Sequence, residues 1–296
     1  KENPEYIENK LTYAGLKKQE EFSWLKEVDA QPLSLVNMDL NKAYKNTFNS
    51  KFGFPKFKSK KYSKKSYRTA VGMKVNGRYF YVSKVGWVKM AEELRFKGKL
   101  MNVTISQTKS GNYFATFLVD AENFQQEPVA NNIGLDLGLT HFCITSAGEK
   151  IDNNRFYRSL EQRLIREQRK LSKRLEVAKK HNRKLDECRN YQKQKVKVAR
   201  IHEKIANQRT DFLHKLSSRL TDENQIICIE DLNVKGLVKN HKLAKSISDV
   251  SWSEFVRQLD YKCAWKGRTL VKVDRFFPSS QLCSSCGHND GKKELN

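Results

Sequence analysis

Two carboxylates, Asp136 and Glu230, interrupt or follow apolar runs of the chain. Asp136 lies between Gly134 and Gly138 in IGLDLGL, and Glu230 directly follows the four apolar residues 226–229. A carboxylate inside a buried strand carries a desolvation cost, so a fold keeps it only where a cation, a metal or a hydrogen-bond network satisfies it. Both side chains are therefore candidate metal ligands.

The chemistry that such a pair serves is phosphodiester hydrolysis. Two Mg²⁺ ions about 3.5–4 Å apart need clustered oxygen ligands to hold them against a phosphate, and two carboxylates are the minimum. Two buried strands that each deliver one acid, with a hairpin and helices between them, fit an RNase H-like nuclease core. Two alternatives remain open: the strand pattern around Asp136 also occurs in sugar-kinase and actin-like folds, and an acid that closes a strand is often a helix cap.

A cysteine pair near the end of the chain has metal-binding spacing. Cys283 and Cys286 in CSSCGH form half of a zinc ribbon, and Zn²⁺ takes four tetrahedral ligands. His288 is either a third ligand or a turn residue, and the turn is favoured. Cys143 and Cys228 lie in apolar runs and are typical of small core residues. The pattern suits a reducing cytoplasm, where paired cysteines hold metal more often than they form disulfides.

The charge of the chain indicates a polyanionic partner. The 296 residues carry 57 Lys and Arg against 33 Asp and Glu, a formal net charge of +24 spread over most of the length. Such a field favours nucleic acid. A membrane surface is the competing partner, but no apolar stretch approaches the roughly 18 residues of a spanning helix and no signal peptide is visible. We therefore expect no membrane partner.

The N-terminal third predicts helices followed by a basic, aromatic segment. Residues 5–48 have helical apolar spacing and predict two packed helices, with Pro32 as the first residue of the second. In residues 51–67 lysines alternate with aromatic residues, so bases can stack while lysines meet phosphates. The alternative is a solvated loop whose aromatic rings lie in the core. The candidate nucleic-acid contacts are Phe54, Lys56, Phe57, Lys58, Lys60 and Lys61.

The rest of the chain alternates between strand and helix patterns. Residues 68–120 have period two and predict an antiparallel sheet or small barrel, and residues 121–131 predict a linker. Residues 157–220 predict a helical hairpin whose charged face is either solvated or bound to nucleic acid. The apolar run before Glu230 is typical of a parallel strand covered on both faces. A helix at 251–267 and a strand at 269–274 follow.

Five motifs in this order closely resemble the TnpB family of transposon-encoded, RNA-guided DNA endonucleases, which is related to type V CRISPR effectors. They are IGLDLGL, RTDFLHKLSSRL, IICIEDLNVKGL, SISDVSWSEFVRQLDYKCAWKG and RFFPSSQLCSSCGH. The resemblance implies a multidomain α/β and α+β fold. Its expected parts are a helical recognition domain (1–50), a wedge-type β-barrel domain with the basic aromatic loop (51–125), a RuvC nuclease domain (131–275) with the helical hairpin 157–220, and a partial zinc-binding domain (276–296).

The resemblance also implies partners and site residues. The family binds a guide RNA made from the transposon end, reads a short motif beside its target and cuts double-stranded DNA, so base pairing supplies sequence choice. One chain per guide RNA is expected. Asp136 and Glu230 match the first two RuvC carboxylates, which hold Mg²⁺, and Cys283 and Cys286 match the first zinc pair. Tyr13, and Ser34 on the helix after Pro32, fall where the family reads its adjacent motif.

Two functional hypotheses follow from the resemblance. The first is a Mg²⁺-dependent, RNA-guided nuclease, and the second is a nuclease-dead, RNA-guided DNA-binding repressor. The presence of Asp136 and Glu230 favours the nuclease. The family's opening strand and helix, its second cysteine pair and its third acid are not in these 296 residues. We therefore expect the natural protein to continue past Asn296 with a second C-x₂-C pair and an aspartate.

Overall fold

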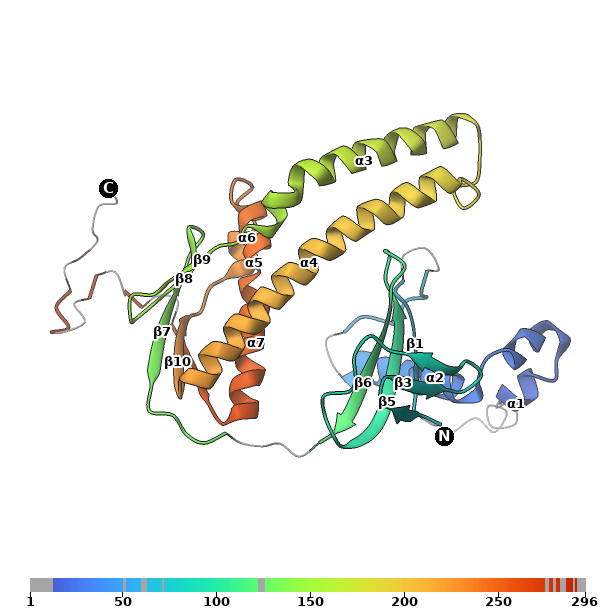
Figure 1. The fold of residues 1–296 in the computed structure, drawn as a ribbon, viewed down its shortest axis with the longest axis horizontal. Helices are drawn as coiled ribbons and strands as arrows, with labels where there is room; N and C mark the ends of the chain where they lie inside the picture. Colours follow the sequence, from blue (N-terminus) through green and yellow to red (C-terminus); the bar gives the residue numbers. More distant parts are fainter. Residues whose placement is uncertain are drawn as a thin grey trace. The chain divides into compact units, whose positions relative to one another are not determined.

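The chain forms two compact units, Lys1–Glu122 and Asn123–Asn296. The computed structural model describes residues 13–49, 52–59, 63–70, 72–121, 126–274, 277–278, 281–282, 286–289 and 291 (Figure 1). None of the described helices is both long and apolar enough to cross a membrane.

The helices of the first unit differ in part from the prediction of two packed helices over residues 5–48. The described elements are α1 (Tyr13–Leu16), the 3-10 helix η2 (Glu20–Lys26) and the long helix α2 (Ala30–Asn49). Leu25 is the only buried residue of η2. A short helix needs packing for its stability, so this segment does not form a long helix. Pro32 is the third residue of α2 instead of the first; a proline is tolerated there because first-turn N–H groups lack helical partners.

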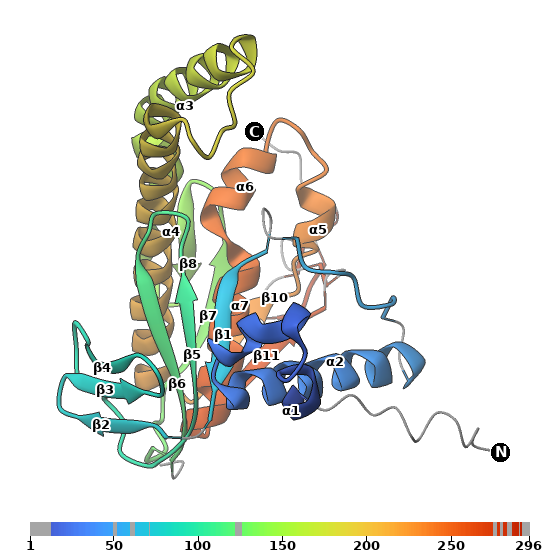
Figure 2. The same ribbon diagram turned by 90° about the vertical axis from the view of Figure 1, so that its right-hand side faces the viewer.

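The β region of the first unit consists of two antiparallel sheets with three strands each (Figure 2). One has the order β1-β5-β6 and the other β2-β3-β4. The predicted barrel is wrong for the described residues, because the outer strands of neither sheet pair to close a ring. In a closed barrel every strand pairs with a neighbour on both sides. The strands of the second sheet have only three or four residues and so form few backbone hydrogen bonds. The strands are β1 (Lys65–Thr69), β2 (Lys74–Asn76), β3 (Tyr79–Val82), β4 (Gly86–Lys89), β5 (Lys99–Gln107) and β6 (Tyr113–Asp120).

The second unit is built on a five-stranded mixed sheet in the order β11-β10-β7-β8-β9. Strands β7, β10 and β11 are parallel, and β8 and β9 continue from β7 as antiparallel hairpins. The predicted hairpin after Asp136 and the predicted parallel strand before Glu230 are both confirmed. The strands are β7 (Asn132–Leu137), β8 (His141–Thr145), β9 (Lys150–Asp152), β10 (Ile226–Glu230) and β11 (Thr269–Val273).

Helices cover one face of this sheet. The charged segment predicted as a helical hairpin forms α3 and α4; α4 packs against α3 and also against α7 (Figure 1). Phe142 of β8 contacts the rings of Phe212 and Phe255 at centroid distances of 5.1 and 4.9 Å, which joins sheet and helices in one core. The helices are α3 (Phe156–Lys180), α4 (Arg189–Glu223), α5 (Val234–Leu237), α6 (Ala244–Val250) and α7 (Trp252–Lys266).

Strand β10 is buried on one face only, which corrects the expectation of cover on both faces. Ile227 and Ile229 are almost fully buried, whereas Ile226, Cys228 and Glu230 are half-buried. Side chains alternate along a strand, so an unbroken apolar sequence does not require two covered faces.

A polar joint fixes the start of the helical hairpin to α6. Both carboxylate oxygens of Asp249 accept from the backbone N–H of Tyr157 at 3.0 Å, and Oδ1 also accepts from Arg209 Nη2 at 2.8 Å. Lys245 of α6 pairs with Glu161 of α3. Because Asp249 is almost buried, its charge depends on these partners.

Candidate active site

The register of the parallel strands places the two predicted acids side by side. Leu135 on β7 pairs with Ile229 on β10, and both side chains lie in the core. The next residue on each strand is Asp136 and Glu230, respectively. Because successive side chains point to opposite faces, both carboxylates project from the face opposite the core.

The surroundings of the two acids differ from the sequence-based expectation. Asp136 is exposed and Glu230 is half-buried, so the predicted burial of Asp136 is wrong. Leu135 and Leu137 carry the apolar signal on one face, and Asp136 lies on the other. The pKa of Glu230 is raised, first by burial and second by the charge of Asp136. The charge of Asp136 therefore opposes ionisation of Glu230.

The backbone that carries the acids is held by local bonds. Gly138 N donates to Phe142 O at 3.2 Å in the turn after β7, where an added Cβ would lie 3.1 Å from His141 O. A glycine therefore allows this close turn. The backbone N–H of Asp231, directly after Glu230, donates to Val273 O at 3.1 Å. Both acids thus sit on strands whose positions are fixed by neighbours.

The two carboxylates offer an incomplete metal shell. In the described part of the chain, neither makes an ion pair within 4.0 Å, and no group of three or more His, Cys, Asp or Glu side chains lies close enough to share a metal. Two adjacent carboxylates without a cationic partner suit a hard divalent cation such as Mg²⁺, which also keeps several waters. The donor set therefore fits part of a magnesium site.

The predicted zinc residues are described only in part. Cys283 lies outside the described residues, and Cys286 has an exposed, free thiol. His288 is exposed near it in sequence. Zinc binding by the pair stays a prediction.

The predicted nucleic-acid contacts of the first unit are exposed where they are described. Ser34 is exposed on α2, and Tyr13 is the first residue of α1. The alternative that the loop aromatics lie in the core is wrong for three rings, because Phe52, Phe54 and Phe57 are all exposed. Lys56 and Lys58 are exposed as well, whereas Lys60 and Lys61 lie outside the described residues.

Comparison with known proteins decides the family. Residues 116–241 match the family OrfB_IS605, described as "Probable transposase", and residues 252–295 match the Cas12f1-like TNB domain. A protein of Streptomyces pristinaespiralis named "Putative RNA-guided DNA endonuclease" is 37% identical over 301 residues, which cover 98% of this chain and 71% of the relative. The chain belongs to the TnpB family.

Two further comparisons give proteins to which the TnpB-family chain is similar. An Escherichia coli K12 protein named "Putative RNA-guided DNA endonuclease InsQ" is 32% identical over 294 residues, covering 93% of this chain and 70% of the relative. A chain from a Cas12f1–sgRNA–target DNA complex has a TM-score of 0.44 and 13% identity, covering 97% of this chain and 69% of that chain.

Sequence reasoning missed two features of this TnpB-family chain. The first is the joint at Asp249, which has no local pattern because its partners are 40 and 92 residues away. The second is a basic groove between α3 and α4. Its signal was present: Lys197, Arg200 and Lys204 recur at intervals of three and four, which places them on one helix face.

Proposed function

We propose that this protein is an RNA-guided DNA endonuclease whose RuvC-type site contains Asp136 and Glu230. The observation that carries the proposal is their position: adjacent residues of two parallel central strands, on one face, with no cationic partner among the described residues. Two neighbouring carboxylates without a cationic partner repel each other, and a bound metal ion relieves that repulsion. Family membership supports the same function.

The sheet supports an RNase H-like origin of this site. Strands β9, β8 and β7 pair in an antiparallel way, and β10 and β11 then continue the sheet parallel to β7. The acids lie on the neighbouring parallel strands β7 and β10. On this proposal, 131–275 is the RuvC domain with the hairpin 157–220. Residues 1–50, 51–125 and 276–296 are the recognition, wedge-type and zinc-binding parts, the last with Cys283 and Cys286.

The two carboxylates would hold Mg²⁺ by their oxygens. Bound there, Mg²⁺ would supply a Lewis acid for the phosphodiester and lower the pKa of attacking water. Asp136 and Glu230 would orient the ions from fixed strands and cancel part of their charge. Burial and then the charge of Asp136 raise the pKa of Glu230, and a bound cation would oppose both effects by stabilising the charged carboxylate.

A guide RNA and double-stranded DNA with an adjacent motif are the proposed partners, with one chain per guide. The net charge of +24 supports phosphate binding along much of the chain. In the first unit, the exposed rings Phe54 and Phe57 beside Lys56 and Lys58 would stack bases and meet phosphates. Tyr13 and Ser34 remain the proposed contacts to the adjacent motif.

Cleavage of guided target DNA tests the site. In the full-length protein, Asp136→Asn and Glu230→Gln should each reduce the Mg²⁺-dependent rate about 10³-fold, since several kcal/mol of charge stabilisation are lost. Guided DNA binding should persist. Asp260→Asn and Glu187→Gln, exposed acids with matched substitutions, serve as controls.

The outcomes separate the hypotheses. Wild-type cutting by either site variant would remove that residue from the site. Guided DNA binding without any cutting by the wild-type protein would instead favour the nuclease-dead repressor.

A further inference from the structure

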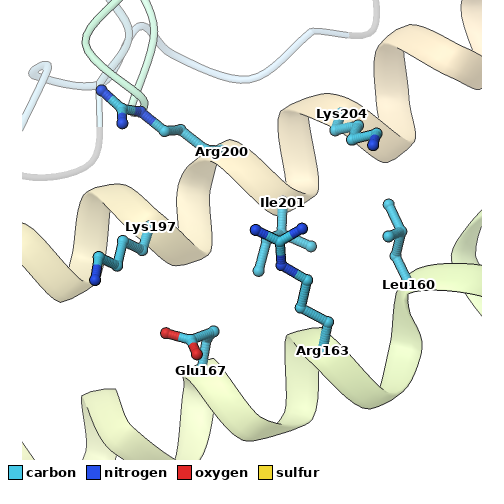
Figure 3. A pocket seen from close by; sticks show the side chains of 7 residues that line it. All are labelled: Leu160, Arg163, Glu167, Lys197, Arg200, Ile201 and Lys204. Atoms are coloured by element: carbon cyan, nitrogen blue, oxygen red, sulfur yellow. The ribbon is translucent and has the colours of Figure 1, made fainter.

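A groove of about 430 Å³ runs between α3 and α4, and neither Asp136 nor Glu230 lines it (Figure 3). Seven residues line it. Arg163, Glu167 and Leu160 project from α3, and the remaining four project from α4. Those four are Lys197, Arg200, Ile201 and Lys204.

The single acid of the groove is already engaged. Glu167 accepts from Lys170 Nζ at 2.8 Å and from Gln194 Nε2 at 2.6 Å, and these bonds lower its pKa to about 2. Gln194 is almost completely buried, so this contact is part of the packing between the helices. Glu167 therefore cannot turn to neutralise the whole groove.

Most of the groove's cations lack an internal partner. Within the described part of the chain, Arg163, Arg200 and Lys204 form no ion pair within 4.0 Å. Lys197 interacts electrostatically with Glu167, which already binds Lys170 and Gln194. A hollow surface with this excess of positive charge attracts an anion with several charges.

The cations form a row on a rigid support. Lys197, Arg200 and Lys204 extend over about 10 Å of helix at 1.5 Å per residue. The buried residues Leu164, Val198, Ile201 and Ile205 lock α3 against α4 beneath the row. Such a row meets several anionic groups in succession, as a polymer presents them, better than one isolated anion.

We infer that this groove binds consecutive phosphates of one nucleic-acid strand. The inference rests on the proposed function and adds the place where the helical hairpin holds the backbone. Guide RNA and target DNA share the phosphodiester chemistry, so the experiment distinguishes them.

The test removes two of the groove's charges from the full-length protein. The variant Arg200→Gln/Lys204→Gln is compared with Arg169→Gln/Lys195→Gln, which loses the same two charge types at exposed positions of the same hairpin. Lys195 precedes Ile201 by six residues and so lies about 120° around α4 from it. Thermal melting before binding confirms that all variants fold.

Affinity is measured against salt with three probes: guide RNA, guide RNA with duplex target DNA, and a single-stranded RNA of mixed sequence. Each phosphate contact contributes about 0.7 to the slope of log affinity against log salt for single strands. The groove variant should lose about 1.4 of slope, and the control variant less than half of that. A loss with guide RNA alone assigns the groove to RNA, and a loss only with target present assigns it to DNA.

Equal slopes for groove and control variants with every probe would overturn the inference. A different result would contradict the proposed function, namely that the wild-type protein binds mixed-sequence RNA as tightly as its guide RNA. A slope loss confined to the groove variant would still support the groove in that case.

Discussion

Two pairs of like charges in the second unit have opposite environments. Asp136 and Glu230 lie beside each other on an open sheet face without a cationic partner among the described residues. Lys262 and Lys266 lie one turn apart on α7, against α4. Lys262 is 7% exposed, yet its Nζ donates to His214 O, Ser217 Oγ and Ser218 Oγ at 2.7–2.8 Å.

The difference distinguishes a structural charge from a functional one. All three donors of Lys262 have oxygen acceptors, and Lys266 reaches Thr221 Oγ1 and Asp222 Oδ1. The hydrogen-bond donors of Lys262 are therefore satisfied by the fold itself. The acid pair has no such partners among the described residues, and on the proposed function a bound cation would stabilise it.

The largest expected effect is on stability at Asp249, an acid that the fold satisfies. Asp249→Ala leaves Arg209 without its carboxylate and should reduce the free energy of unfolding by about 3–5 kcal/mol. Asp136→Ala should change it by less than about 0.5 kcal/mol, because this exposed acid has no such partner. Urea unfolding of the full-length protein measures both.

Asp249→Asn provides the control, since the amide oxygen can still accept from Tyr157 while the charge is lost. It should lie between wild type and alanine. If Asp136→Ala were as destabilising as Asp249→Ala, Asp136 would be structural and the contrast between the two acids would be lost.

A smaller effect concerns pH and Lys262. Burial, and next the charge of Lys266, lower the pKa of Lys262 from 10.5 to about 8. Between these values the unfolded state binds more protons than the folded state, so this lysine makes stability rise with pH. In Lys262→Met that rise should disappear, and the variant should lose stability relative to wild type from pH 8 to pH 10.

Unfolding free energies at several pH values measure the difference. Lys195→Met, an exposed lysine, is the matched control and should leave the pH dependence unchanged. Parallel curves for wild type and Lys262→Met would show that the lysine has an ordinary pKa in the fold.

The smallest effect sharpens the acid side of the comparison. Mg²⁺ at ten times its dissociation constant should stabilise the wild-type protein by about 1.4 kcal/mol, or about 2–4 °C in melting temperature. Asp136→Asn should lose most of this shift, and chelation should reverse it in wild type. An identical shift in Asp260→Asn and Asp136→Asn would place the Mg²⁺ elsewhere.

Local patterns predicted the elements of the second unit well. The helical spacing of residues 157–220 and the apolar run at 226–229 became α3, α4 and β10, because both periodicities reflect burial on one side of an element. The weaker spacing before Pro32 failed, since the described residues 20–26 bury only Leu25. Propensity alone does not hold a helix without packing.

The sequence by itself determined that Asp136 lies within one core strand and Glu230 ends another, that basic residues recur on one face of α4, and that the chain is strongly basic. Tertiary structure decided the rest. Pairing of Leu135 with Ile229 brings the acids together although they are far apart in the sequence, whereas the outer strands described in the first unit pair with no further described strand. The reason is that side-chain periodicity is a local property, whereas register, edge pairing and the satisfaction of buried charge depend on neighbours far away in the sequence.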